Sequence, residues 1–212
     1  ESSVMELFAG LGYEVVYGPE IERDQRSPLY DEVLEDYIRR LNADLPKDAI
    51  ADVLFKLRNF DNGDLVLCNE VFMDYLQNGV PVRYTVKGEE RAAIAYLVDY
   101  ANPANNSFIA ANQWTYIENS TKRPDVVLFL NGLPIVIIEL KSPSREETDA
   151  SEAYLQLRNY QKLIPSLFTY NAFNVMSDMA LTKIGTVTAK EDRYMEWKQP
   201  TGEVADYDVA FK

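Results

Sequence analysis

Residues 125–140 read Asp-Val-Val-Leu-Phe-Leu-Asn-Gly-Leu-Pro-Ile-Val-Ile-Ile-Glu-Leu, and this stretch carries the clearest structural signal in the chain. Two apolar runs flank Asn131-Gly132, a dipeptide typical of the type I′ turn that closes a two-residue β-hairpin. Both runs are apolar at consecutive positions, whereas a strand with one solvated face would alternate between apolar and polar residues. The stretch therefore predicts two adjacent strands at the centre of a sheet that is covered on both faces.

The segments on either side of this hairpin add helices and further strands. Helical spacing of apolar residues and short apolar runs identify them, and Pro165 ends the longest helix. Helices are predicted at 4–11, 31–41, 48–57, 64–77 and 146–164, and strands at 13–17, 80–86, 92–98, 107–118, 173–177 and 185–188. This order predicts an α/β fold with a central mixed β-sheet flanked by helices. We expect residues 1–212 to form a single domain, with a helical insertion at about 28–79.

The charge of the chain is large and uneven. Its 212 residues include 34 acidic and 21 basic side chains, a formal net charge of −13. Nucleic-acid binders usually show a basic surface, so the total alone argues against such a partner. However, residues 1–120 hold 21 acidic and 10 basic residues, whereas residues 121–212 hold 13 and 11. The acidity therefore belongs mainly to the first part of the chain, and the part that contains the hairpin is nearly balanced.

Two residue types limit the chemistry that the chain can perform. Histidine is absent, which excludes Ser-His-Asp and Cys-His catalysis and histidine-ligated metals. The single cysteine, Cys68, excludes an internal disulfide and fits a reducing location such as the cytoplasm. Any metal site must use oxygen ligands, which suits Mg²⁺, Mn²⁺ or Ca²⁺. Because no apolar run reaches the length of a membrane span, none is predicted.

Two carboxylates and a lysine are predicted to meet at the open end of the hairpin. Glu139 follows four aliphatic residues, and Lys141, two residues later, points to the same face of the strand. Asp125 begins the other strand, six residues before the turn, whereas Glu139 lies seven residues after it. The two acids can therefore lie close together, within one residue of register. A buried carboxylate needs a partner, and a hard cation beside a lysine suits metal-assisted phosphodiester hydrolysis.

Polar groups on the following helix and a basic pair before the hairpin add to this site. Glu152, Gln156 and Tyr160 are spaced by four residues and share one helical face. The amide and the phenol can hydrogen-bond phosphate oxygens or order the lysine and the waters of a metal. Lys122 and Arg123 are candidates for contacts with DNA phosphates.

Each candidate also has an ordinary structural explanation. Glu139 and Lys141 could form a solvent-facing ion pair, and an aspartate after a proline, such as Asp125, often caps a turn. Gln156 and Tyr160 could form an exposed pair on the helix surface, and the basic pair could belong to a solvated loop. Residues expected to be structural rather than functional are Cys68, Trp114 and Tyr116.

Together, these motifs resemble those of a nuclease superfamily. Pro124-Asp125, Glu139-Leu140-Lys141 and the Gln-x-x-x-Tyr of 156–160 are similar to the PD-(D/E)xK pattern with the QxxxY element of its RecB-like branch. Over nearly the whole chain, further segments resemble the restriction (R, HsdR) subunit of type I restriction–modification enzymes. These segments are 11–14, the acidic helix after Tyr30, 78–82, 102–106, 123–127, 131–134, 139–143 and 164–168.

The resemblance implies a restriction-endonuclease-like core that cuts double-stranded DNA with Mg²⁺, or with Mn²⁺ in its place. The roles that it implies are metal ligation by Asp125 and Glu139, catalysis by Lys141, support by Gln156 and Tyr160, and a further acid at Glu1. Restriction subunits also carry ATP-driven motor domains and assemble with methylation and specificity subunits. No Gly-x-x-x-x-Gly-Lys-Ser/Thr motif occurs here, and the chain starts without methionine, so a fragment without the motor is expected.

Two other functions remain open from the sequence. One is a stand-alone RecB-like exonuclease or repair nuclease. The other is a nuclease fold that serves as an interaction module without activity. For the restriction-subunit reading, the acidic first part of the chain predicts weak DNA binding by these residues alone, with affinity supplied by basic motor and partner surfaces.

Overall fold

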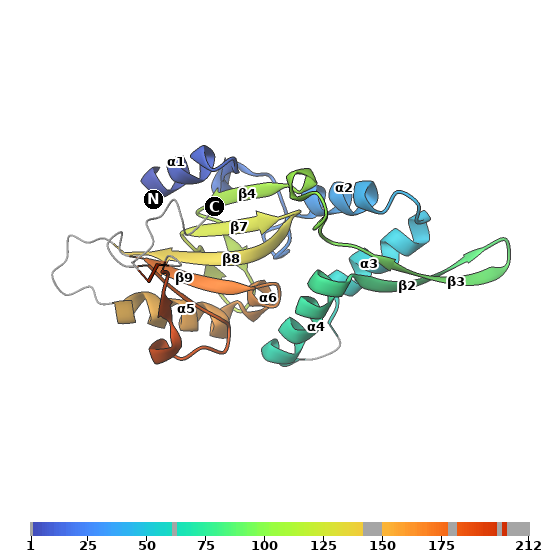
Figure 1. Ribbon diagram of the computed structural model, residues 1–212. Helices are drawn as coiled ribbons and strands as arrows, with labels where there is room; N and C mark the ends of the chain where they lie inside the picture. Colours follow the sequence, from blue (N-terminus) through green and yellow to red (C-terminus); the bar gives the residue numbers. More distant parts are fainter. Residues whose placement is uncertain (1, 61–62, 142–149, 178–181, 199–200, 203–212) are drawn as a thin grey trace.

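The computed structural model describes residues 2–60, 63–141, 150–177, 182–198 and 201–202 (Figure 1). Its centre is a 7-stranded sheet with the order β1-β4-β7-β8-β9-β10-β11. The strands are β1 (Glu14–Tyr17), β4 (Phe108–Asn112), β7 (Val126–Leu130), β8 (Leu133–Leu140), β9 (Phe173–Ser177), β10 (Thr182–Gly185) and β11 (Met195–Glu196). β1 runs parallel to β4 and β8 runs parallel to β9, whereas the other neighbours are antiparallel. The predicted α/β class with a mixed central sheet is confirmed.

Helices lie on both faces of this sheet (Figure 1). On one face, α1 (Ser2–Gly10) buries Val4, Met5 and Phe8 against aliphatic side chains of β7, β8 and β9. On the other face, α5 (Ala150–Leu163) and α6 (Pro165–Phe168) bury Leu157 and Phe168 against β8 and β9. β7 and β8 are therefore covered from both sides, as their continuous apolar sequence predicts.

The turn between β7 and β8 has the predicted type I′ geometry. Asn131 and Gly132 have φ angles of 54° and 84°, and both must be positive in such a turn. The Asn131 side chain is fully buried and fully bonded. Its Oδ1 accepts a hydrogen bond from the Ser107 amide at 2.7 Å. Its amide group donates to the Leu97 carbonyl at 2.9 Å and to Asn106 Oδ1 at 3.0 Å.

The same turn is seated against the first turn of α2 (Asp31–Leu41). The Tyr30 amide donates to the Gly132 carbonyl at 2.9 Å. A Cβ atom on Gly132 would lie 2.7 Å from the Tyr30 carbonyl oxygen and 2.6 Å from the Leu34 nitrogen. Only glycine permits this close approach of two backbones at a positive φ.

The register of the hairpin changes once along its length. Leu128 pairs with Val136, but Phe129 pairs with Pro134. Ile135 is therefore an extra residue in β8, which makes a β-bulge. Because of this bulge, Asp125 and Glu139 can lie opposite each other although they are different numbers of residues away from the turn.

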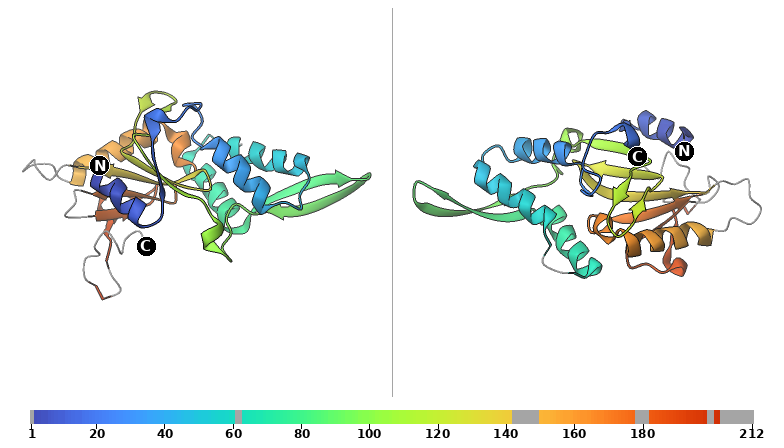
Figure 2. Two further views of the ribbon diagram at one scale, coloured as in Figure 1. Left: turned by 90° about the horizontal axis from the view of Figure 1, so that it is seen from above. Right: turned by 180° about the vertical axis from the view of Figure 1, so that it is seen from behind.

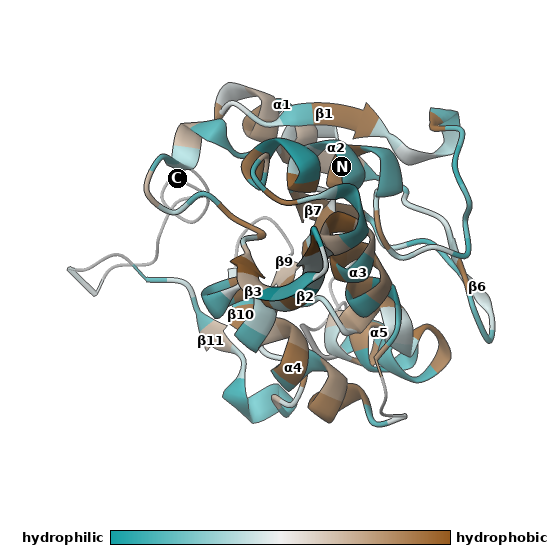
Figure 3. Ribbon diagram, turned by 90° about the vertical axis from the view of Figure 1, so that its right-hand side faces the viewer, coloured by the Kyte–Doolittle hydropathy of each residue, from teal (hydrophilic) through white to brown (hydrophobic). Residues whose placement is uncertain are grey.

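A large excursion separates β1 from β4, which are neighbours in the sheet. It comprises α2, α3 (Lys47–Arg58), α4 (Leu65–Asn78), β2 (Val80–Val86) and β3 (Glu89–Ala95). The antiparallel pair β2–β3 packs against α3 at its base and extends away from the rest of the molecule (Figures 1 and 2). Along the excursion, the ribbon of α2 is coloured mostly hydrophilic, whereas α4 contains more hydrophobic residues (Figure 3).

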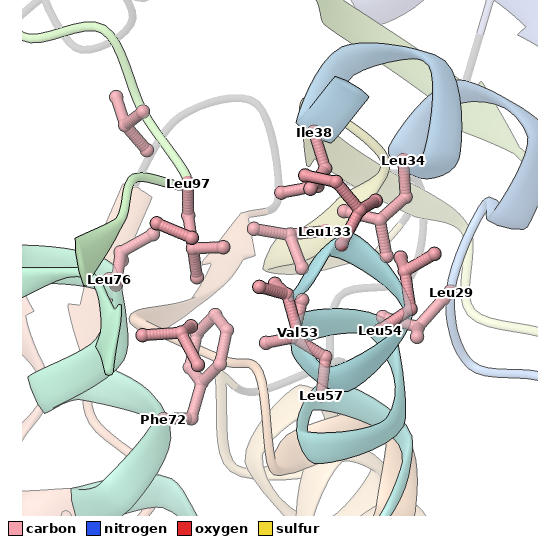
Figure 4. Close-up of a cluster of buried hydrophobic side chains, with 14 of the residues drawn as sticks. Leu29, Leu34, Ile38, Val53, Leu54, Leu57, Phe72, Leu76, Leu97 and Leu133 are labelled. Atoms are coloured by element: carbon pink, nitrogen blue, oxygen red, sulfur yellow. The ribbon is translucent and has the colours of Figure 1, made fainter. Parts of the chain in front are cut away.

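The excursion has its own cluster of buried side chains. Leu34 and Ile38 of α2, Val53 and Leu57 of α3, and Phe72 and Leu76 of α4 converge on Leu133 of the central hairpin (Figure 4). The three helices occupy most of the range 28–79, in which helices were predicted. The cluster therefore joins the excursion to the turn end of the hairpin.

Several element boundaries differ from the prediction. β3 begins at Glu89 rather than at 92, because Lys87 and Gly88 alone form the turn, both with positive φ. The strand expected over 107–118 breaks at Gln113, whose φ is 55°, and β5 (Tyr116–Ile117) then pairs with β6 (Thr121–Lys122). β10 lies at Thr182–Gly185 rather than at 185–188, and the sequence did not predict β11. Residues 146–149 of the expected helix lie outside the described part of the chain.

Candidate active site

The hairpin brings Asp125 and Glu139 together at its open end. The last pair of the ladder on that side joins Val126 and Ile138, so one further step sets the two acids opposite each other. The Leu140 amide donates to Asp125 Oδ2 at 2.8 Å, which ties the aspartate to the neighbouring strand. The uncertainty of one residue in the predicted register is resolved by the bulge at Ile135.

Glu139 is a buried carboxylate with one oxygen paired to a lysine. Lys141 Nζ lies 3.3 Å from Glu139 Oε1, and the two side chains are 23% and 5% exposed. Within the described residues, Glu139 Oε2 is buried and has no hydrogen-bond partner. The pair is therefore not a solvent-facing ion pair, and the second carboxylate oxygen is buried without a direct hydrogen bond in the described chain.

The electrostatics of the site disfavour the ionised form of Glu139. Burial raises the pKa of Glu139 from 4.5 to about 7, and the neighbouring charge of Asp125 contributes to the increase. Lys141 and the nearby Tyr160 hydroxyl lower the pKa but do not cancel the increase. Two carboxylates with one ammonium group leave an excess of negative charge in a buried place. A cation bound at this position would relieve that excess.

Two residues of α5 support the glutamate from below the sheet. Gln156 Nε2 donates a hydrogen bond to the Tyr160 hydroxyl at 2.8 Å. Tyr160 is buried, and its pKa is raised by burial and then by the charge of Glu139. The structure therefore brings Gln156 and Tyr160 to the site as one bonded pair. Glu152, on the same helix, is exposed.

The donor set fits a hard cation. Asp125 and Glu139 supply carboxylate oxygens, and the unpartnered Glu139 Oε2 is the observation in the fold that calls for a positive partner. Mg²⁺ commonly uses one or two protein carboxylates and keeps several waters. Among the residues that the structure describes, no group of three acidic or cysteine side chains gathers around one point. Glu1, the predicted further acid, lies outside the described residues.

The structure places the two predicted DNA contacts immediately before Asp125. Lys122 is half-buried in β6, where it pairs with Tyr116, and Arg123 is exposed. Pro124, between Arg123 and Asp125, is buried. No contact in the described structure joins Lys122 or Arg123 to the carboxylates, so their role as phosphate contacts stays a prediction.

Some groups that hold the site could not be named from the sequence. The Gln113 amide donates to the Asp125 carbonyl at 2.9 Å, and the Lys141 amide donates to the Ser177 carbonyl at 2.8 Å. Both bonds use only backbone atoms, which every residue type provides. The sequence therefore gives no indication that these bonds form. Trp114 and Tyr116 are buried, which confirms that they belong to the core.

In the part of the chain that the structure describes, no helix has the length and apolar character needed to cross a membrane.

Comparisons with known proteins point to one family. A family model described as type I restriction enzyme R protein N terminus (HSDR_N) matches residues 1–193. The type I restriction enzyme HindI endonuclease subunit of Haemophilus influenzae is 34% identical over 208 residues, which cover 93% of this chain and 20% of that protein. A Methanocaldococcus jannaschii protein assigned as the MjaIXP endonuclease subunit is 33% identical over 219 residues, 99% of this chain and 21% of that protein.

A further relative is shorter. The type I restriction enzyme EcoprrI endonuclease subunit of Escherichia coli is 28% identical over 193 residues, 82% of this chain and 60% of that protein. This chain thus spans about a fifth of the length of the first two relatives. The sequence segments, the mixed sheet and these matches agree, and the chain belongs to the type I restriction enzyme R protein N-terminus family.

Proposed function

We propose that this chain is a metal-dependent nuclease domain that cuts double-stranded DNA. One observation carries the proposal: Asp125 and Glu139 face each other at the open end of the hairpin, with Lys141 bonded to one oxygen of Glu139 and the other oxygen buried without a partner in the described chain. The names of the relatives, which are endonuclease subunits of type I restriction enzymes, support the same chemistry.

The two carboxylates would hold Mg²⁺ or Mn²⁺. When bound, such an ion lowers the pKa of a water molecule and neutralises charge that develops on a phosphodiester. Asp125 is held for this task by the Leu140 amide, and Glu139 by Lys141 and Tyr160. The acids are therefore positioned before DNA arrives, and little reorganisation is required.

Lys141 would contribute to catalysis by contacting the substrate, rather than to the stability of the fold. Its ammonium group is partly exposed and has three donors, of which Glu139 Oε1 uses one. The remaining donors can orient the attacking water or a phosphate oxygen, and the positive charge stabilises the anionic transition state. Gln156 would hold Tyr160, and through it Glu139, in place.

The wider function follows from the family. We propose that cleavage is coupled to ATP-dependent DNA translocation by motor domains outside these residues, in a complex with methylation and specificity subunits. Such a complex would defend a cell against foreign DNA. Because the chain spans about a fifth of the first two relatives, delivery of DNA to the site would depend on the remaining parts.

Substitutions in the complete restriction complex test the proposal. Asp125→Asn and Lys141→Ala should each lower the rate of plasmid cleavage by at least about 100-fold, because each removes transition-state stabilisation, while ATP hydrolysis continues. Lys162→Ala is the control, because Lys162 is an exposed lysine of α5. If both site variants cut DNA at the rate of the control, these residues do not form the active site. Loss of Mg²⁺ binding in Glu139→Ala, followed by titration calorimetry, would separate a nuclease from an inactive module.

A further inference from the structure

The two tryptophans of the chain have opposite environments. Trp114 is fully buried, and the guanidinium carbon of Arg23 lies 3.5 Å from the centroid of its ring. Trp197, just after β11, lines an open groove of about 580 Å³. Trp114 is thus committed to the core, whereas Trp197 is half-buried and lines the groove.

This groove lies at the edge of the central sheet, and we call it the edge groove. Its lining includes Phe173, Ile184, Met195 and Trp197 as apolar walls, and Arg193 and Lys198 as basic groups. The rings of Phe173 and Trp197 have centroids 6.1 Å apart and planes inclined at 51°. Met195 is 70% exposed, more than any other large apolar side chain among the described residues. The volume falls within the range of pockets for small ligands.

The edge groove reaches the active-site end of the sheet only at Trp197, and its other walls, Phe173 and residues 185–189, lie toward the opposite end of β9 and β10. The Trp197 amide donates to the Thr182 carbonyl at 3.1 Å, and the Thr182 and Ser177 hydroxyls lie 3.0 Å apart. The Lys141 amide in turn donates to the Ser177 carbonyl at 2.8 Å. One row of hydrogen bonds therefore links Trp197 to Lys141 across β10 and β9. Three strand spacings correspond to about 14 Å, or about four base steps along a duplex.

The groove and the carboxylates face opposite sides of the sheet. Ile184, in the groove, packs with the cluster beneath α1, whereas Glu139 lies on the side of α5 next to Tyr160. DNA held at the active site would reach the groove only by passing around the end of the sheet. A flexible unpaired strand can follow such a path, but a stiff duplex cannot.

The chemistry of the lining suits a nucleotide. Aromatic side chains bind unpaired bases by stacking, and basic side chains next to them hold the phosphates. The described ion pairs of Arg193 with Asp192 and of Lys198 with Glu196 are both 3.9 Å long and exposed, so they are weak and readily exchanged for phosphate. Glu196 offsets part of the positive charge in the lining. Stacking, rather than charge, would therefore supply most of the affinity.

We propose that the edge groove binds an unpaired nucleotide of the DNA substrate, with its base on Trp197 and its phosphate near Arg193 and Lys198. The inference rests on the proposed nuclease function for its relevance to cleavage, but binding itself does not require an active site. In a chain with a net charge of −13, a contact based on stacking would hold DNA where charge attraction is poor.

Fluorescence and affinity measurements on the 212-residue chain test this proposal. The probe is single-stranded oligothymidylate of about eight nucleotides, within the range bound by known single-strand sites. It should quench the tryptophan emission of the wild type, and Trp197→Phe, which retains Trp114, should lose the quenching. Trp197→Ala should weaken binding by about 5- to 150-fold, the value of one stacked base. Because stacking carries the contact, this difference should change little between low and high salt.

Matched variants control for folding and for charge. Met195→Glu places an acid in the groove at an exposed position, and should weaken binding as much as Trp197→Ala. Phe55→Glu makes the same charge change at a side chain that is 63% exposed on α3, and should leave binding unchanged. Circular dichroism of each variant checks that it is folded.

The outcomes are distinct from those for the active site. Asp125→Asn should abolish cleavage and retain quenching by the oligothymidylate, so failure of one proposal does not imply failure of the other. If Trp197→Ala and Met195→Glu bind the oligonucleotide as tightly as the wild type, the groove does not bind nucleotides. An equal loss of affinity for a blunt duplex would also overturn the proposal, because a blunt duplex offers no unpaired base.

Discussion

The two ends of the β7–β8 hairpin are built in opposite ways. At the turn end, Asn131 is fully buried, and its side-chain oxygen and amide group are all hydrogen-bonded. At the open end, Glu139 is also buried, but within the described residues its Oε2 has no partner. Both ends belong to the same pair of apolar strands, so burial alone does not distinguish them.

The difference lies in whether the buried polar atoms are satisfied by the chain itself. A buried polar group with all its partners stabilises and specifies a fold, whereas an unsatisfied one raises its free energy. The turn end thus attaches the helical excursion to the sheet. At the open end, the buried Glu139 carboxylate has too little positive charge near it to offset its own charge and that of Asp125. We infer that substitutions should act with opposite signs at the two ends, and the following predictions test this contrast.

The largest expected effect is at the turn end. Gly132→Ala should lower the free energy of unfolding by about 2 to 5 kcal/mol, because it adds the strain of a positive φ to a clash with the backbone at Tyr30 and Leu34. The measurement is urea denaturation followed by circular dichroism. Gly88→Ala is the matched control, since Gly88 has a φ of 86° but a Cβ atom there would meet no described atom within 4 Å. It should cost only about 1 kcal/mol, and equal losses would show that contact with α2 does not matter.

At the open end the sign should reverse. Glu139→Gln should stabilise the metal-free protein at pH 8 by up to about 3 kcal/mol, while it removes cleavage. The pKa of Glu139 in the folded state is about 7, above its ordinary 4.5, so the ionised form is less stable in the fold than in the unfolded chain. Below about pH 4.5 the carboxyl is protonated in both states and the penalty is absent. The penalty grows as the pH rises from there and is complete above about 7.

Denaturation of wild type and Glu139→Gln at pH 4 and pH 8, with a chelator present, measures this effect. The two proteins should differ little at pH 4 and most at pH 8. Glu152→Gln, at an exposed position of α5, should match the wild type at both values. A destabilised Glu139→Gln at pH 8 would mean that the carboxylate is already satisfied in the folded chain.

A divalent metal ion should stabilise the protein only through the open end of the β7–β8 hairpin, where Glu139 lies. Millimolar Mg²⁺ should stabilise the wild type at pH 8 by about 1 to 2 kcal/mol, the value for a ligand at roughly ten times its dissociation constant. The same addition should leave Glu139→Gln unchanged and should stabilise Gly132→Ala as much as the wild type. Thermal unfolding with Mg²⁺ or with a chelator measures this. Equal stabilisation of Glu139→Gln would place the metal elsewhere.

The smallest expected effect concerns the support of the open end. Gln156→Leu removes the hydrogen bond to the Tyr160 hydroxyl and should cost about 1 kcal/mol of stability. Because Gln156 acts through Tyr160, the rate of cleavage should fall while the apparent affinity for DNA stays constant. Asn159→Leu is the same change at a half-buried neighbour on α5 and should have neither effect. A change in affinity alone would contradict a positioning role.

The central hairpin and the excursion helices were predictable from the sequence for a simple reason. Both depend on local patterns: continuous apolar runs, an Asn-Gly turn, and apolar residues at helical spacing. The meeting of Asp125 with Glu139 and Lys141 was predictable because all three belong to one hairpin. The pair of Gln156 and Tyr160 was predictable as a pair on one helix face, and its supporting place at the site followed from the family resemblance.

What could not be predicted depends on contacts between distant segments. β11 is a two-residue strand that exists only because β10 lies beside it. The break at Gln113 depends on a positive φ that no neighbouring residue signals. The backbone bond from Lys141 to Ser177 joins strands that are remote in sequence and leaves no mark on side-chain identity. The edge groove likewise combines Phe173 of β9 with Trp197, which no local pattern relates.

The bulge at Ile135 has a consequence for how related sequences should be aligned. With Ile135, Glu139 lies seven residues after the turn and still opposes Asp125, which lies six residues before it. Without Ile135 the two arms would be equal in length, and the same two acids would again be opposite each other. A relative that lacks one residue at this position therefore keeps its acids together. A gap of one residue between the bulge and Glu139 that left the bulge in place would instead set the glutamate opposite Val126, on the far face of the sheet.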